Sequence, residues 1–321
     1  MKLALIGYGN VGRALARLLH GHVGAYPFRI TGIHTARHGT AIGENGLPLE
    51  PEFGPAAASA AAFLDAARAD VAVELTSLNP VTGEPAKAHI RAAFARGMHV
   101  VTANKGPLAH DFHALSAEAA GRGLLFRYES TVMDGAPVFN LVRNCLPGVR
   151  VHGFTGVLNS TSKLVIETME QGGSFEEGVH VARRLGVAEA EASFDLEGWD
   201  SACKTAALAN VLMDARTNPR QVSTRGITRL TPERVRQLAC SGKTIRLVSR
   251  AHRGPRGLAL RVRAEVLDRH DALASVHGTS NLLLLHTDVM GTVGVISISP
   301  GVDQTAYGVF SDLVEIARAR T

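Results

Sequence analysis

Near the start of this 321-residue chain, the segment GYGNVG places glycines at Gly7, Gly9 and Gly12. A short apolar run of strand type, residues 2–6, precedes it, and apolar residues at helical spacing follow it over 11–19. Glycines at this spacing between a strand and a helix permit a tight turn, close approach of a pyrophosphate and close packing of the two elements. The segment therefore predicts dinucleotide binding at a helix N-terminus, with an ordinary flexible turn as the alternative.

Strand and helix patterns alternate as far as residue 130. Strands are expected at residues 2–6, 28–34, 71–75, 99–102 and 124–128, and helices at 11–19, 56–67, 85–96 and 110–122. Strands separated by helical stretches of this length indicate crossover connections and a parallel sheet. We therefore expect residues 1–130 to form an α/β nucleotide-binding domain of the Rossmann type, with a doubly wound parallel sheet.

After Thr131, glycine and proline interrupt the chain and the pattern changes. Strands are expected around 149–157, 258–267, 282–288 and 293–299, and helices at 162–171, 174–185, 200–213 and 305–320. Ser174 followed by Glu177 is a capping-box pattern, and Thr231 before Pro232 marks a second helix start. SGKT at 241–244 lacks the Walker spacing and is interpreted as a helix end. These patterns predict a second domain of the α+β class over residues 131–300.

The end of the second strand bears on the choice of coenzyme. NAD-binding domains of this type usually carry a carboxylate about 20 residues after the glycine loop, where it binds the ribose 2′-hydroxyl. Here the strand ends in HTARH, with no acid and with Arg37 within reach. A carboxylate would repel a 2′-phosphate, so the sequence favours NADP over NAD, although Arg37 could also be an ordinary solvated arginine.

Composition excludes several classes of function. The net charge is +5, and the 34 basic residues are scattered, which does not indicate a nucleic-acid-binding stripe. The longest apolar runs fall far short of the roughly 20 residues that a membrane span needs. Three cysteines without CxxC spacing fit reduced thiols in the cytoplasm, and the 14 histidines show no zinc-site spacing. A small-molecule substrate is the expected partner.

Only six of the basic residues are lysines, and two of them occupy informative positions. Lys105 follows a predicted strand in VVTANKGPL, at the carboxyl edge of the sheet, where ligands of such folds bind. Lys204 ends the segment EAEASFDLEGWDSACK. The acids that precede it there are Glu189, Glu191, Asp195, Glu197 and Asp200.

Asp200 and Lys204 have two interpretations. Their spacing suits a simple i,i+4 pair on a helix surface, worth a few tenths of a kcal/mol. Alternatively, carboxylates hold the ammonium group of a substrate while the lysine handles a proton. Hydride reduction of a carbonyl leaves an alkoxide that must be protonated, and a positioned lysine can supply that proton.

Several segments together resemble homoserine dehydrogenase, in the right order and over essentially the whole chain. Besides GYGNVG they are VELTS (73–77), TANKGPL (102–108), YESTVMDGAPV (128–138), GVLNST (156–161), DLEGWDSACK (195–204) and GVDQTAYGVFSDL (301–313). The resemblance implies a Rossmann domain completed by residues 301–321, and a substrate-binding and dimerisation domain. It also implies NAD(P)-dependent interconversion of L-aspartate 4-semialdehyde and L-homoserine by a homodimer.

The resemblance also implies roles for individual residues. Catalytic lysines would be Lys204, as proton donor in reduction, and Lys105. Substrate-binding residues would be Glu189, Asp195, Asp200 and Thr161. The cofactor would be contacted by Gly7, Gly9, Asn10, Val11, Gly12, Arg37, Thr76, Lys105, Gly301 and Thr305. Backbone carbonyls of Glu129, Val132, Asp134 and Ala136 would be able to hold a sodium ion.

The sequence departs from the family pattern at a few positions. Ser160, Lys163 and Leu164 replace glycine, asparagine and an aromatic residue, and AEAEA at 188–192 replaces AExDP. Asp134 stands where a small residue is commoner. Two rival hypotheses follow: a dehydrogenase of the same fold that acts on another amino aldehyde or keto acid, and a catalytically silent NAD(P)-binding protein.

Overall fold

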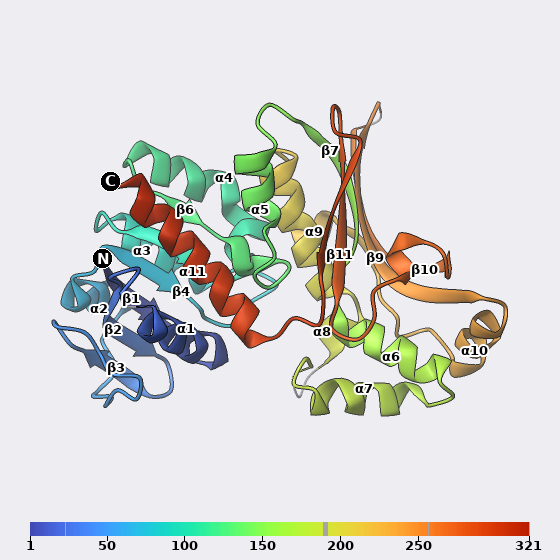
Figure 1. The fold of residues 1–321 in the computed structure, drawn as a ribbon, viewed down its shortest axis with the longest axis horizontal. Helices are drawn as coiled ribbons and strands as arrows, with labels where there is room; N and C mark the ends of the chain where they lie inside the picture. Colours follow the sequence, from blue (N-terminus) through green and yellow to red (C-terminus); the bar gives the residue numbers. More distant parts are fainter. Residues whose placement is uncertain (23, 189–191, 256, 321) are drawn as a thin grey trace. The chain divides into compact units, whose positions relative to one another are not determined.

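The computed structural model describes residues 1–22, 24–188, 192–255 and 257–320, and the chain folds into two compact units. One comprises Met1–Phe139 with Gly301–Thr321, and the other comprises Asn140–Pro300 (Figure 1). Residues 131–139, expected in the second domain, belong to the first unit, where Phe139 N donates to Glu129 Oε1 at 2.8 Å. Within the described ranges, none of the helices has the length and apolar character to cross a membrane.

The first unit contains a six-stranded sheet of order β3-β2-β1-β4-β5-β6. Its strands are β1 (Lys2–Ile6), β2 (Arg29–Thr35), β3 (Gly39–Ile42), β4 (Val71–Glu74), β5 (His99–Thr102) and β6 (Phe126–Arg127). All neighbours pair in parallel except β3, which returns antiparallel to β2 as an unpredicted short hairpin. The strand order reverses direction at β1, and the doubly wound α/β class is confirmed.

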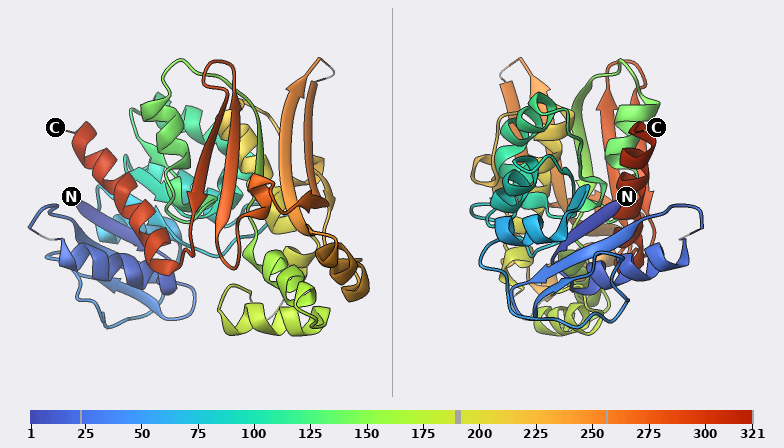
Figure 2. Two further views of the ribbon diagram at one scale, coloured as in Figure 1. Left: turned by 45° about the vertical axis from the view of Figure 1, so that its right-hand side comes forward. Right: turned by 90° about the vertical axis from the view of Figure 1, so that its left-hand side faces the viewer.

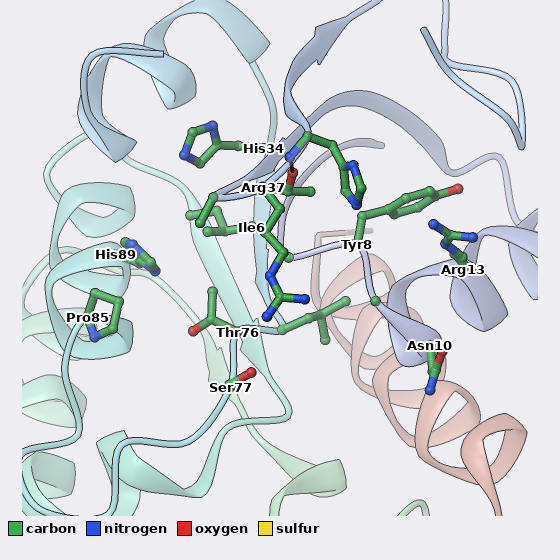
Figure 3. A pocket seen from close by; sticks show the side chains of 16 residues that line it. Ile6, Tyr8, Asn10, Arg13, His34, Arg37, Thr76, Ser77, Pro85 and His89 are labelled. Carbon is green, nitrogen blue, oxygen red and sulfur yellow. Dashed lines mark hydrogen bonds between the residues drawn. The ribbon is translucent and has the colours of Figure 1, made fainter. Parts of the chain in front are cut away.

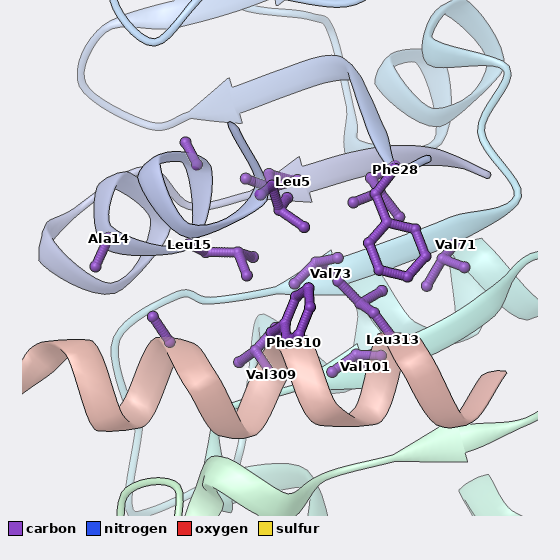
Figure 4. Close-up of a cluster of buried hydrophobic side chains, with 14 of the residues drawn as sticks. Leu5, Ala14, Leu15, Phe28, Val71, Val73, Val101, Val309, Phe310 and Leu313 are labelled. Carbon is purple, nitrogen blue, oxygen red and sulfur yellow. The ribbon is translucent and has the colours of Figure 1, made fainter. Parts of the chain in front are cut away.

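Helices cover both faces of this sheet. They are α1 (Asn10–Gly21), α2 (Ala60–Ala67), α3 (Ala86–Phe94), α4 (Lys105–Gly121) and α11 (Val302–Ala319). Helices α1 and α11 pack together on one face, and α2, α3 and α4 form a contiguous layer on the other. Figure 4 shows Val309, Phe310 and Leu313 of α11 directed at the strands that carry Val73 and Val101. The last helix of the chain therefore completes the core of the first unit.

Helix α4 begins at Lys105, not at residue 110 as the pattern predicted. Asn104 caps it, because its Oδ1 accepts a hydrogen bond from Gly106 N at 2.9 Å. Pro107 lies in the first helical turn, where no intrahelical N–H is needed. Lys105 is thus held at a helix start beside the carboxyl end of β5.

The second unit contains a six-stranded sheet of order β12-β11-β7-β9-β10-β8. Its strands are β7 (Val151–Val157), β8 (Ser223–Arg225), β9 (Lys243–Gly254), β10 (Gly257–Asp268), β11 (Asn281–Thr287) and β12 (Thr292–Ser297). Neighbours are antiparallel except β8 and β10, and β9 and β10 form a long hairpin (Figure 2). The expected helix end at SGKT is confirmed for Ser241, the C-cap of the helix that ends at Cys240, but Lys243 and Thr244 already belong to β9.

The helices associated with the second unit include both predicted helix starts. They are α6 (Ser160–Glu170), α7 (Phe175–Arg184), α8 (Ser193–Leu196), α9 (Trp199–Leu212) and α10 (Pro232–Cys240). The short helix α5 (Val138–Asn140) spans the chain boundary between the two units and continues into the π-helical turn Leu141–Cys145 of the second unit. The capping box at Ser174 and the Thr231 cap are confirmed. Helices α6 and α9 pack against β9, and α9 also packs against β10, so the sheet of the second unit supports these two helices.

Candidate active site

A cavity of about 670 Å³ opens at the carboxyl ends of β1, β2 and β4 in the first unit (Figure 3). Its walls come from the glycine loop, the turn after β2, the loop after β4 and the start of α3. The lining residues are Ile6, Gly7, Tyr8, Gly9, Asn10, Arg13, His34, Thr35, Ala36, Arg37, His38, Leu75, Thr76, Ser77, Pro85 and His89. Ligands of doubly wound sheets bind where the strand order reverses, and this cavity lies at that place.

The three glycines of the loop have different structural roles. Gly7 has a φ of +102°, and a Cβ there would lie 2.7 Å from Leu75 O. A Cβ on Gly12 would lie 3.0 Å from Gly7 O, so these two glycines permit the strand, loop and helix to pack closely. A Cβ on Gly9 would meet no atom within 4 Å, because the space beside it is open. Gly9 thus leaves room for a ligand at the start of α1.

The end of the cavity at the turn after β2 is rich in basic groups. Arg37 extends into the cavity, and Arg13 lies over the Tyr8 ring at 6.0 Å from its centroid. Burial, together with neighbouring His89, lowers the pKa of His34. The described residues that line the cavity include no carboxylate.

Five of the predicted cofactor residues line this cavity: Gly7, Gly9, Asn10, Arg37 and Thr76. The others named by the resemblance, Val11, Gly12, Lys105, Gly301 and Thr305, are not among its described lining residues. Tyr8, Arg13, His34, His38 and His89 line the cavity without having been predicted. Arg13 and His38 could have been found from their positions, one helical turn into α1 and next to Arg37.

A second cluster lies wholly in the second unit and joins α6 to α9. Lys204 Nζ lies 3.0 Å from Asp200 Oδ2 and donates to Leu158 O at 2.5 Å. The two side chains are only 15% and 16% exposed. The i,i+4 pair considered from the sequence therefore exists, but in a largely buried setting and with a backbone carbonyl as a further acceptor.

Asn159 gathers the two carboxylates of this cluster. Its Nδ2 donates to Asp195 Oδ1 at 2.6 Å and to Asp200 Oδ2 at 3.1 Å. Thr161 Oγ1 donates to Asp195 Oδ2 at 3.1 Å. Asn159 is also the N-cap of α6, since its Oδ1 accepts from Ser162 N at 2.8 Å. One side chain therefore both starts the helix and arranges the acids, and α8 and α9 deliver those acids to it.

Burial and the adjacent Asp200 raise the pKa of Asp195, against the lowering effects of Asn159, Lys204 and Thr161. Two carboxylates beside one ammonium group form a site with excess negative charge. Such a site suits the ammonium group of an amino acid, because a second cation would balance the second carboxylate.

The structure brings together four predicted residues: Thr161, Asp195, Asp200 and Lys204. Glu189 lies outside the described residues. Asn159 was missed as a site residue, although an asparagine directly before a helical pattern is a recognisable cap signal. Lys105 belongs to the first unit, at the start of α4.

Comparisons with known proteins show which family the chain belongs to. Residues 137–314 match the homoserine dehydrogenase family, and residues 7–129 match the NAD binding domain of homoserine dehydrogenase. The chain is 34% identical to the NAD(+)-dependent homoserine dehydrogenase of Pseudomonas canavaninivorans, covering 100% of this chain and 97% of that protein. It is 33% identical to the homoserine dehydrogenase of Methanocaldococcus jannaschii, with 98% of each covered.

The fold agrees as well. A crystal structure of a homoserine dehydrogenase from Thiobacillus denitrificans superposes with a TM-score of 0.85 at 28% identity, covering 100% of this chain and 74% of that chain. The chain belongs to the homoserine dehydrogenase family.

Two departures from the homoserine dehydrogenase pattern have structural explanations. Ser160 Oγ donates to Thr279 O at 3.1 Å, and buried Lys163 donates to Ser280 O. Both substitutions therefore attach the start of α6 to the turn before β11. They support the helix that carries Asn159 and Thr161.

The four carbonyls that the sequence resemblance implies for a sodium ion lie in the first unit, in the segment 129–136. Carbonyl oxygens such as those of Glu129, Val132, Asp134 and Ala136 are hard donors of the kind that such cations take. Ala136 O also accepts from Val138 N at 2.8 Å, which leaves it one further lone pair. Asp134 has a φ of +57°, an unusual conformation for a non-glycine residue. This donor set fits a hard cation chemically.

Proposed function

We propose that Lys204 is the proton donor in the NAD(P)-dependent reduction of L-aspartate 4-semialdehyde to L-homoserine, and the acceptor in the reverse direction. By its family the chain is an NAD(P)-dependent oxidoreductase that acts on a CH–OH group. The observation that supports the role of Lys204 is its largely buried ammonium group, which is held by Asp200 and Leu158 O and lies near the carboxylate of Asp195. When bound, the nicotinamide supplies or accepts the hydride.

The neighbouring side chains would bind and orient the amino acid. Asp195 and Asp200, with Glu189, attract the substrate ammonium group, and Thr161 fixes Asp195 by donating to its second oxygen. Lys204 keeps its proton within reach of the alkoxide that hydride transfer creates, because Asp200 restrains its flexible chain. Lys105 is proposed as the second catalytic lysine.

Turnover of homoserine tests these roles. We expect the wild type to reduce NADP with homoserine, and Lys204→Ala to lower kcat by about 10²- to 10⁴-fold, the usual contribution of a positioned proton donor. Lys105→Ala should also be impaired. Lys243→Ala is the matched control, since Lys243 is exposed at the start of β9. Unchanged kcat in both catalytic variants would refute the assignment.

We also propose that the chain prefers NADP. The support is the carboxylate-free lining near Arg37, among the described residues, where a 2′-phosphate would meet Arg37 and His38. Arg37→Glu should raise KM for NADPH much more than KM for NADH. Arg122→Glu, a change at the exposed end of α4, should alter neither value. Equal effects of Arg37→Glu on the two coenzymes would contradict this preference.

Sodium binding by the carbonyls of residues 129–136 is proposed from the donor set. Turnover should rise when sodium chloride replaces choline chloride at constant ionic strength, because a filled site would order this loop. Identical rates in the two salts would argue against a functional site.

We further propose a homodimer formed through the second unit. Ile296 on the edge strand β12 is 50% exposed and Ile298 just after it is 74% exposed, which is apolar surface that association would cover. Sedimentation should give a dimer for the wild type and a shift toward monomer for Ile296→Glu. A monomeric wild type would contradict the proposal.

A further inference from the structure

A buried carboxylate next to the cofactor cavity has no role in the function described so far. Glu74 is the last residue of β4 and is 1% exposed. Its Oε1 accepts from Thr76 N at 3.2 Å and from Thr76 Oγ1, and its Oε2 accepts from Thr102 Oγ1 at 3.1 Å. Thr76 lines the cavity, whereas Glu74 lies behind it. The carboxylate therefore fixes a residue of the cavity wall from the protein side.

The contacts continue from Glu74 to the start of α4. Thr102 Oγ1 accepts from Asn104 N at 3.0 Å. The same hydroxyl therefore donates to Glu74 and accepts from Asn104. Asn104 Nδ2 donates to Thr76 O at 3.0 Å and to Ser77 O at 3.2 Å. The hydrogen bonds thus close a ring that runs from Glu74 through Thr102 and Asn104 to Thr76.

The same ring sets the first turn of α4. Asn104 Oδ1 accepts from Gly106 N at 2.9 Å, and Lys105 is the first residue of the helix. His89 from α3 also approaches, with Nδ1 3.5 Å from Glu74 Oε1. One carboxylate therefore connects β4, β5, α3 and α4 around the end of the sheet where the cavity opens.

Burying a carboxylate costs desolvation free energy, and removing a buried charge network in favour of neutral packing is often neutral for stability. Stability alone thus gives a weak reason for a carboxylate here. Two hydroxyl donors and one backbone amide donor converge on its two oxygens, and a carboxylate has acceptor positions for all three.

We propose that Glu74 is a positioning residue for the dehydrogenase reaction: it holds the Thr76–Ser77 wall of the cofactor cavity and, through Thr102 and Asn104, the helix start that carries Lys105. This inference rests on the proposed function, because it assumes that the cavity binds the coenzyme and that Lys105 takes part in the reaction.

The ring has two arms: the contacts of Glu74 with Thr76, and its contact with Thr102. Substitutions can separate the effects of these two arms. Glu74→Gln removes the negative charge that both oxygens share and places an amide donor opposite one of the two hydroxyl groups, so the hydrogen bonds of both arms weaken. Thr102→Val removes the link to Asn104 and leaves the two contacts of Thr76 with Glu74. The control is Thr31→Val, because Thr31 is a buried threonine on β2 whose hydroxyl donates to Ala67 O at 2.9 Å, away from the ring.

The experiment measures the NADPH dissociation constant by fluorescence titration, kcat and KM for homoserine, and the thermal unfolding midpoint. Glu74→Gln should weaken NADPH binding and lower kcat by about tenfold or more each, the range expected for charge-assisted hydrogen bonds. Thr102→Val should lower kcat and change NADPH binding less than about threefold, since the Thr76 contacts with Glu74 remain. Thr31→Val should change neither quantity.

Two outcomes would overturn the inference. If Glu74→Gln and Thr102→Val differ from wild type only in unfolding midpoint, Glu74 is purely structural. If Glu74→Gln does not fold, Thr102→Val decides, and an unchanged kcat there overturns the proposed link to Lys105. If the wild type bound neither coenzyme, the proposed function itself would be refuted. This outcome is distinguishable from failure of the inference about Glu74, because it is observed without any variant.

Discussion

The side-chain amide of Asn159 lies 2.6 Å from the carboxylate of Asp195. The same nitrogen also reaches Asp200, so a neutral group holds two acids together at the start of α6. Because the acids repel each other, their arrangement depends on this donor and on Lys204. The relationship makes Asn159 a third determinant of the proposed substrate site, beside the acids and the lysine.

Asn159→Ser separates the two tasks of this residue. Serine is about as good an N-cap as asparagine, so the unfolding midpoint should change little. The amide donor to the carboxylates is lost, and kcat/KM for homoserine should fall by about tenfold to hundredfold, the usual effect of losing a hydrogen bond to a charged group. A variant with unchanged kcat/KM would show that Asn159 is only a helix cap.

Asp195→Asn should lose activity without losing stability. The folded pKa of Asp195 is raised, so the folded chain binds this proton more tightly than the unfolded chain does. Protonated Asp195 therefore stabilises the folded chain fully below the pKa of the unfolded chain, which is about 4. This stabilisation is lost as pH rises through the pKa of Asp195 in the folded chain. Asparagine removes this dependence, and the variant should match or exceed the wild-type unfolding midpoint at neutral pH.

Asp65→Asn is the control, because the pKa of Asp65 is shifted in the opposite direction from that of Asp195. The hydrogen bond from Arg96 lowers the pKa of Asp65, so that carboxylate contributes stability above its unfolded pKa and loses it as pH falls. Unfolding midpoints measured from pH 4 to 8 distinguish the two slopes. A decrease in the midpoint of Asp195→Asn with rising pH, parallel to wild type, would contradict the raised pKa.

The first unit was largely predictable because its signals are local. The glycine loop, the alternation of strands and helices, and the position of Lys105 after β5 all follow from residue type and period. The start of α4 was wrong because Pro107 resembles a helix break unless the cap at Asn104 is recognised. The short hairpin of β3 was missed because four residues are too few to establish a period.

The second unit was harder to predict because tertiary contacts override its pattern. Strand β9 carries Arg246, which interrupts the apolar run and yet is buried. Its guanidinium lies 3.3 Å from Glu167 Oε1 of α6, a pairing between residues distant in sequence. Likewise, the acids before Lys204 were visible in the sequence, but their joint contact with Asn159 depends on how α6, α8 and α9 pack.

Phe310→Ala should strongly destabilise the first unit. Phe310 is 6% exposed in α11 and packs against Tyr26 and Phe28, with ring centroids 5.4 Å and 6.0 Å away. Truncating a buried phenylalanine costs about 3–5 kcal/mol. Tyr307→Ala on the same helix is the control, since Tyr307 is 56% exposed and its loss should cost less than about 1 kcal/mol. Equal destabilisation in urea unfolding would mean that α11 does not complete this core.

Gly9→Ala should separate the ligand role of the glycine loop from its structural role. The added Cβ would meet no protein atom within 4 Å, and the residue has a φ of −83°, which alanine adopts. The fold should therefore tolerate the change at a cost of about 1 kcal/mol, because alanine is a poorer N-cap than glycine. The methyl group would occupy the space through which a pyrophosphate approaches α1, so NADPH affinity should fall by more than tenfold.

Gly21→Ala is the control, because Gly21 lies at the other end of the same helix and is also in open space, so NADPH affinity should stay unchanged. If titration gave the same dissociation constant for both variants and wild type, the pyrophosphate would have to bind elsewhere than at this loop.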